Sequence, residues 1–128
     1  MTIWNLGGIN ADYVYGVPHI PAPGETLDAA SRQVFVGGKG ANMSVAAARG
    51  GAHVRHIGAV GQDGRWAVDR LTEYGVDTRD IATVETETAH AMIFVAPDGE
   101  NGIVVYPGAN RAIPENHPNQ SLTQAKTG

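Results

Sequence analysis

The chain of 128 residues contains no cysteine, which excludes a disulfide framework and catalysis by a thiolate. Basic residues are also few, because 9 Lys and Arg stand against 13 Asp and Glu, for a net charge of −4. No cluster of basic residues is present to bind a phosphate backbone, so the sequence argues against nucleic acid as a partner. The length suffices for about one domain with a substantial core.

Long hydrophobic runs are missing as well. No stretch approaches the roughly 18 apolar residues of a membrane-spanning helix, which predicts no membrane partner. The polar residues Asn5, Asn10 and Asp12 interrupt the start of the chain, so this segment does not resemble a signal peptide. Together with the lack of cysteine, these features predict a cytoplasmic protein.

Glycine, in contrast, is abundant, with 17 residues that gather at the expected boundaries of strands and helices. The alternation of strands and helices predicts an α/β fold with a parallel, doubly wound sheet. Turn residues around Asp98 predict a hairpin, and hairpins imply a small antiparallel sheet attached to the first. In the second helix, Trp66, Val68 and Leu71 form the expected buried side. Strands are expected at residues 3–9, 13–17, 26–36, 54–60, 81–86, 89–96 and 102–106, and helices at 38–49 and 64–74.

The most informative segment is a glycine-rich turn that leads from a strand into an alanine-rich helix. Lys39 and Asn42 lie three residues apart, so both belong to the first turn of this helix, where free N–H groups point outward. The segment is not a Walker A motif, because Gln33 stands where a glycine is required and Gly40 follows the lysine. These groups are suited to binding a small polar molecule, although a glycine-rich turn before a helix is also common without any ligand.

Asn10 and Asp12 form a second candidate site, after the strand end at Gly7 and Gly8. Because strand residues alternate, both side chains are expected on one side. A carboxylate and an amide at the carboxyl end of a strand are well suited to binding hydroxyl groups. The alternative is an Asx turn or a helix N-cap, which uses the same residue types.

The histidines are predicted to be structural or surface residues, because no pair has the spacing of a metal site. No histidine or aspartate is expected beside Ser44, so its hydroxyl is a weak candidate for a nucleophile. The histidines are His19, His53, His56, His90 and His117.

Six short motifs follow one another along the chain: Gly8–Asp12, Pro21–Thr26, Gly37–Asn42, Gly58–Gly64, Gly99–Asn101 and Pro107–Asn110. Together they resemble the N-terminal half of the ribokinase-like (PfkB) family of carbohydrate kinases, and within it the ribokinases. Six motifs in one order are far more specific than any single motif.

The resemblance implies a Rossmann-like, three-layer α/β/α body with a small β-sheet lid that covers a sugar. Residues 1–112 would form the N-terminal part of this domain, and 113–128 the truncated start of the next segment. The family's second signature, an Asp-Thr-x-Gly-Ala-Gly-Asp-like segment, is not found, so only the N-terminal half is expected. The lid strands would be about 13–17, 26–36, 88–96 and 102–107.

The resemblance further implies ATP-dependent phosphorylation of a sugar hydroxymethyl group, with Mg²⁺ as cofactor and K⁺ as an activator. It assigns no catalytic base and no metal ligand to these 128 residues, which alone are expected to be inactive. It also implies a homodimer formed through the lid sheet. The alternatives are a kinase for fructose or a nucleoside, or a truncated, non-catalytic fragment for sugar binding or dimerisation. The sugar-binding positions would be Asn10, Asp12, Gly38, Lys39 and Asn42.

Overall fold

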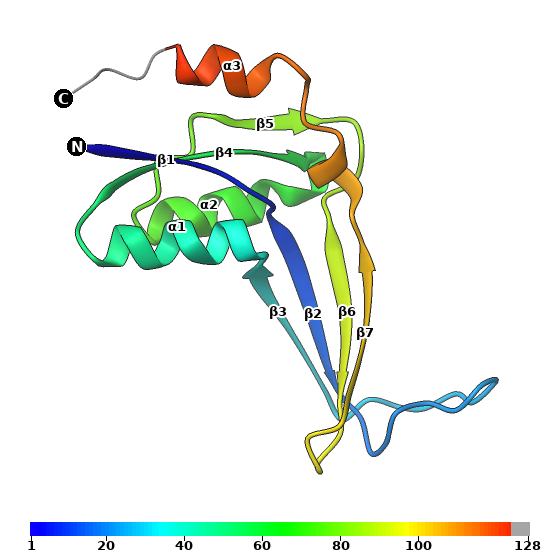
Figure 1. The fold of residues 1–128 in the computed structure, drawn as a ribbon. Coiled ribbons are helices and arrows are strands. Elements are labelled where there is room, and N and C mark those ends of the chain that lie inside the picture. Colours follow the sequence, from blue (N-terminus) through cyan, green and yellow to red (C-terminus); the bar gives the residue numbers. More distant parts are fainter. Residues whose placement is uncertain (124–128) are drawn as a thin grey trace.

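The computed structural model describes residues 1–123 and contains two sheets that meet at one end (Figure 1). The first sheet has three strands in the order β1–β4–β5, and the second has four strands in the order β3–β2–β6–β7. The strands are β1 (Thr2–Leu6), β2 (Asn10–Gly16), β3 (Ser31–Gly37), β4 (His53–Gly61), β5 (Ile81–Val84), β6 (His90–Val95) and β7 (Asn101–Tyr106). The helices are α1 (Lys39–Arg49), α2 (Arg65–Glu73) and α3 (His117–Leu122), with short 3₁₀ turns η1 (Gln62–Gly64) and η2 (Gly108–Arg111).

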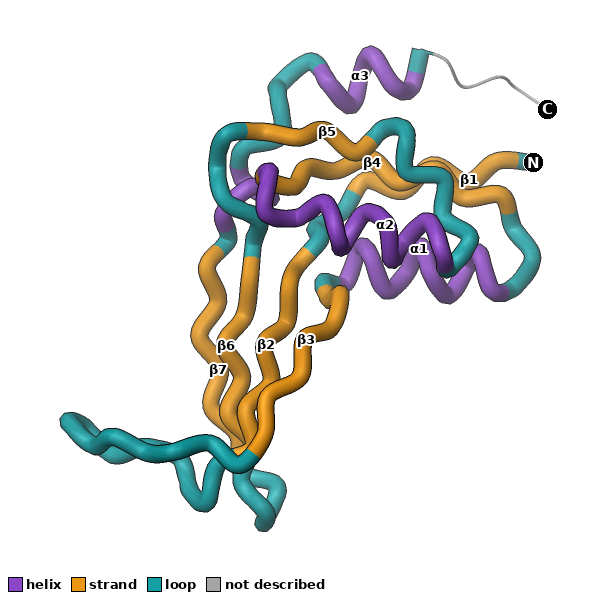
Figure 2. The backbone as a smooth tube through the Cα atoms, turned by 180° about the vertical axis from the view of Figure 1, so that it is seen from behind, coloured by secondary structure: helices purple, strands orange, loops and turns teal. Residues whose placement is uncertain are grey.

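The three-stranded sheet is entirely parallel and forms the middle layer of the body. Helices α1 and α2 cover one of its faces, and α3 lies on the other (Figures 1 and 2). This arrangement confirms the predicted α/β fold with helices on both faces of a parallel sheet. The helix expected at 38–49 is also confirmed, because α1 begins one residue later and ends at Arg49.

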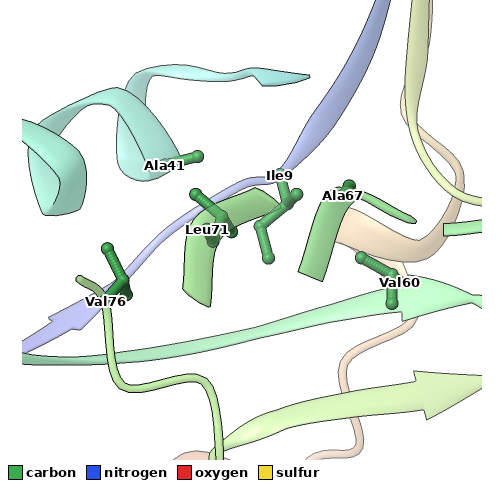
Figure 3. Packing of buried hydrophobic residues seen from close by; sticks show 6 residues of the cluster. All are labelled: Ile9, Ala41, Val60, Ala67, Leu71 and Val76. Atoms are coloured by element: carbon green, nitrogen blue, oxygen red, sulfur yellow. The ribbon is translucent and has the colours of Figure 1, made fainter. Parts of the chain in front are cut away.

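The core lies between the parallel sheet and helices α1 and α2 (Figure 3). Leu71 is completely buried, as its helical spacing predicts, and burying such a side chain contributes roughly 1.5–3 kcal/mol. Trp66 and Val68 are only partly buried and pack against the edge of this cluster. The buried members of the cluster are Ile9, Ala41, Val60, Ala67, Leu71 and Val76.

The four-stranded sheet projects from the body (Figure 1), and one of its pairings corrects the sequence-based expectation. The outer pairs β2–β3 and β6–β7 are antiparallel, but the central pair β2–β6 is parallel. The reason is that β2 follows β1 and β6 follows β5. Both strands therefore leave the body from the carboxyl ends of parallel strands and run outward in the same direction.

The expected strand at 26–36 is also shorter than predicted. Ser31, the first residue of β3, pairs with Gly16, the last residue of β2, so residues 17–30 extend beyond the end of the paired strand. They form the loop at the tip of the projecting sheet (Figure 2). Proline at 18, 21 and 23 suits a loop and not a paired strand. The boundary at residue 112 stays a prediction.

Candidate functional site

Two segments that connect the body to the projecting sheet lie against each other. The first leads from β1 to β2 through Gly7 and Gly8, and the second leads from β3 into α1. A β-carbon on Gly40 would lie only 2.5 Å from Gly7 Cα. Gly38 has a φ of +96°, and a β-carbon there would lie 2.8 Å from the Gly8 carbonyl oxygen. Glycines at these positions therefore allow the start of α1 to approach the start of β2.

Asp12 projects over the end of β3. A β-carbon on Gly37 would lie 2.0 Å from Asp12 Oδ2, so the carboxylate occupies the space that the glycine leaves. Burial raises the pKa of the Asp12 carboxyl above its ordinary value. Within the described part of the chain the carboxylate has no hydrogen-bond partner, so both of its oxygens are available to accept hydrogen bonds from a ligand.

Asn10 lies two residues before Asp12 and is the first residue of β2. Its side chain is held by Asn110 of η2, whose Nδ2 donates to Asn10 Oδ1 at 2.8 Å. Asn110 Oδ1 in turn accepts a hydrogen bond from the backbone N–H of Ile9 at 2.9 Å. Asn110 belongs to the Pro107–Asn110 motif, but its partner lies 100 residues away, and such a contact leaves no mark in local spacing.

Lys39 and Asn42 occupy the first turn of α1, as predicted, and both are exposed. No hydrogen bond connects either side chain to Asn10 or Asp12 within residues 1–123. Asn42 borders a hollow of about 200 Å³ between α1 and α2, together with Leu71. The structure therefore brings Asn10, Asp12 and Gly38 together. Lys39 and Asn42 lie beside this group, exposed at the N-terminus of α1.

A buried network of hydrogen bonds reaches the Gly7 carbonyl. It corrects the expectation that no histidine lies beside Ser44. The Ser44 hydroxyl lies 2.7 Å from His56 Nδ1, although no histidine was expected beside it. His56 Nε2 lies 2.9 Å from the Gly7 carbonyl oxygen, and Asn5 Nδ2 donates to Ser44 Oγ. Ser44 and His56 are completely enclosed, so no substrate reaches the pair and its role is structural.

The hydrogen bonds determine which ring nitrogen of neutral His56 carries the proton. A carbonyl oxygen only accepts, so Nε2 carries the proton and Nδ1 accepts from Ser44. Burial lowers the pKa of His56 below its ordinary value, and the bond to the Gly7 carbonyl opposes this only in part. The folded state therefore favours the neutral imidazole more than the unfolded chain does.

We expect the free energy of unfolding to fall as the pH drops below about 6.5, because unfolded His56 then binds a proton that the folded protein resists. The loss ends once the pH passes the lowered folded-state pKa. Urea unfolding of His56→Gln between about pH 5 and about pH 7.5 should show a weaker pH dependence than the unmodified chain. His53→Gln, which removes an exposed imidazole that pairs with Asp77, is the comparison variant, and an unchanged pH dependence in His56→Gln would contradict the prediction.

A second set of side-chain hydrogen bonds stabilises the segment that connects β5 to β6. Asp63 Oδ1 accepts from both the backbone N–H and the hydroxyl of Thr88, at 2.9 and 2.8 Å. Thr88 Oγ1 also accepts from the Gly61 N–H. Burial raises the pKa of Asp63, but the hydrogen bonds from Thr88, together with the Asp63 backbone N–H and the charge of His90, outweigh it, so the pKa is lowered. Asp63 is thus a structural carboxylate that fixes where β6 begins.

Among residues 1–123, no three histidine or acidic side chains come together as ligands for a metal ion. No helix in the same part of the chain is long and apolar enough to cross a membrane.

Comparison with known proteins identifies the family. Residues 4–127 match the model of the pfkB family carbohydrate kinases. The chain belongs to this family. It is 45% identical over 126 residues to a ribokinase of Haemophilus influenzae, which covers 96% of this chain and 41% of that protein.

Two solved structures of pfkB-family relatives agree with the fold. A ribokinase from Cryptococcus neoformans in complex with ADP matches 84% of this chain and 35% of its own, with 40% identity and a TM-score of 0.77. An Arabidopsis thaliana ribokinase complexed with ribose and ATP matches 89% of this chain and 38% of its own, with 32% identity and a TM-score of 0.80. The chain thus spans about two fifths of the length of these relatives.

Proposed function

We propose that this pfkB-family chain is the sugar-binding part of an ATP-dependent kinase that phosphorylates a hydroxymethyl group of ribose or a related pentose. The observation that carries the proposal is the placement of Asn10 and Asp12. They stand at the carboxyl end of β1, where ligands bind in open α/β sheets, and beside the N-terminus of α1. The similarity to ribokinases, one of them complexed with ribose and ATP, supports this assignment.

In this proposal the chain binds and orients the sugar. The Asp12 carboxylate accepts hydrogen bonds from two neighbouring hydroxyls, and the Asn10 amide contacts the next polar atom. Gly38 packs against Gly8 and holds the start of α1 beside Asn10, and Lys39 and Asn42 add polar groups from the first turn of α1. The two acceptor oxygens of Asp12 and the amide of Asn10 favour one orientation of a polyol. This orientation places its hydroxymethyl group for reaction.

ATP would supply the transferred phosphoryl group. We assign the catalytic base, the ATP site and the sites for Mg²⁺ and K⁺ to sequence outside these 128 residues, so no chemical step is assigned to a described side chain. The cytoplasmic location also stays a prediction.

We further propose that the kinase is a homodimer whose second copy packs on the projecting sheet. Phe35 pairs with Asp12 across β2–β3 and therefore shares its face, and Ile103 and Val105 of β7 share that face through the strand register. These three apolar side chains are 50–56% exposed. A second copy would cover them and close the sheet over the sugar, and sedimentation equilibrium would measure the association.

The function is tested with a chimera in which this chain replaces the matching segment of the Haemophilus influenzae ribokinase. We expect ribose-dependent formation of ADP, with fructose and adenosine as weaker acceptors. Ribose binding without ADP formation would instead favour a non-catalytic sugar-binding module. Preference for fructose or adenosine would move the substrate assignment to those kinases.

A further inference from the structure

Asn110 has two hydrogen bonds that together determine which atoms of Asn10 face outward. The backbone N–H of Ile9 can only donate, so the Asn110 atom that it meets must be the oxygen, Oδ1. The nitrogen of Asn110 then faces Asn10, and Nδ2 donates at 2.8 Å. The Asn10 atom that accepts this bond must be its own oxygen. The usual ambiguity between the two ends of an asparagine amide is thereby removed.

The position of Asn110 itself is fixed by the fold. Its amide lies against Gly8, where a β-carbon would come within 2.9 Å of Asn110 Nδ2. Its backbone N–H donates to Pro107, and the neighbouring Ala109 N–H donates to Glu87. Ile9, on the other side, is completely buried in the core. The backbone of Asn110 and its partner Ile9 are therefore both held in place, and the Asn110 amide is not free to rotate.

On this basis we infer that Asn110 is a positioning residue that makes Asn10 present its amide nitrogen, and not its oxygen, to the ligand. The inference rests on the proposed sugar-binding function. Asn10 Nδ2 has no partner among residues 1–123, so its N–H groups are available. The site then offers a donor at Asn10 beside two acceptor oxygens at Asp12. That pattern fits neutral hydroxyls, which donate to Asp12 and accept from Asn10, and it disfavours an ammonium group at the Asn10 position.

The inference predicts the effect of Asn110→Asp. The new carboxylate still accepts from the Ile9 N–H, but its second oxygen can no longer donate to Asn10. Asn10 is then expected to turn its amide over and to donate to that carboxylate, which leaves its oxygen facing the ligand. A donor in the site becomes an acceptor, and we expect ribose affinity to fall by at least about tenfold.

The test combines two measurements on the isotope-labelled chain. Side-chain amide spectra without ligand report which NH₂ group is protected from exchange: that of Asn110 in the unmodified chain, and that of Asn10 in Asn110→Asp. Ribose titrations of both proteins, and of the charge control Asn101→Asp on the exposed end of β7, report the affinity. Urea unfolding checks that the variants are folded.

Transfer of protection to Asn10 together with weakened ribose binding supports the inference. Ribose affinity within about twofold of the unmodified chain would overturn it, as would an Asn10 NH₂ group that is already protected before the substitution. If the unmodified chain does not respond to ribose, the proposed function is overturned, whereas the orientation of Asn10 is still decided by the amide spectra.

Discussion

Asp12→Asn is expected to weaken ribose binding strongly while making the chain more stable. The two oxygens of the Asp12 carboxylate are the hydrogen-bond acceptors of the site. Hydrogen bonds to a charged group contribute about 1.5–3 kcal/mol each. The amide keeps one acceptor oxygen, but it loses the charge and turns the second acceptor into a donor, so binding is expected to weaken by about tenfold to a hundredfold, on the order of 1.5–3 kcal/mol. The substitution keeps the shape that fits over Gly37, so the fold has no steric reason to change.

The gain in stability follows from the direction of the pKa shift. Burial raises the pKa of the Asp12 carboxyl in the folded state, so the folded protein holds this proton more tightly than the unfolded chain. The favourable contribution of the protonated group is present below the unfolded-state pKa and is lost as the pH rises through the folded-state pKa. At neutral pH the half-buried charge therefore destabilises the fold, and a neutral amide removes that cost.

Calorimetric titration with ribose and thermal unfolding of the same samples check both parts. Asp28→Asn, in the exposed loop before β3, is the matched control and should change neither property. Unchanged ribose affinity in Asp12→Asn would remove Asp12 from the site. A lower melting temperature would show that the carboxylate stabilises the fold, contrary to the account.

Gly40→Ala is expected to destabilise the chain by about 3 kcal/mol or more, at the upper end of the range for overpacked sites. The added methyl group would lie 2.5 Å from Gly7 Cα and 2.7 Å from Gly7 C. These are backbone atoms, so no side-chain rotation relieves the contact. The start of α1 must move away from the β1–β2 crossing, which separates Gly38 from Asn10.

Gly50→Ala at the other end of α1 is the control for this effect. Its φ is −77°, and a β-carbon there would meet no atom closer than 3.4 Å, so we expect a change of less than about 1 kcal/mol. Urea unfolding compares the two variants. Equal stabilities would mean that the close approach of Gly7 and Gly40 is not needed for the fold.

The sequence was sufficient for features that depend on local spacing. Alternation in a strand placed Asn10 and Asp12 on one face, and helical spacing identified Leu71 as buried. The glycines before Lys39 indicated a strand-to-helix turn, and the structure shows why they are needed: two backbones meet there. The six motifs together were also enough to identify the pfkB family, which the comparison confirmed.

Features that depend on distant contacts were not predictable from local patterns. Strand β2 pairs in parallel with β6 because both follow parallel strands, which no hairpin signal reveals. Ser44 meets His56 only after α1 packs on β4. The Asn110–Asn10 bond joins the exit of the projecting sheet to its entrance, across 100 residues. In each case the partner is chosen by the arrangement of whole elements.

In the proposed function, the segment between β1 and β2 binds a sugar together with the start of α1. The most direct test is a titration of the isotope-labelled chain with D-ribose, followed by backbone and side-chain amide spectra. We expect saturable shifts at Asn10, Asp12, Gly38, Lys39 and Asn42, and none at the tip of the projecting sheet. A spectrum that ribose leaves unchanged, or shifts confined to other parts of the chain, would contradict it.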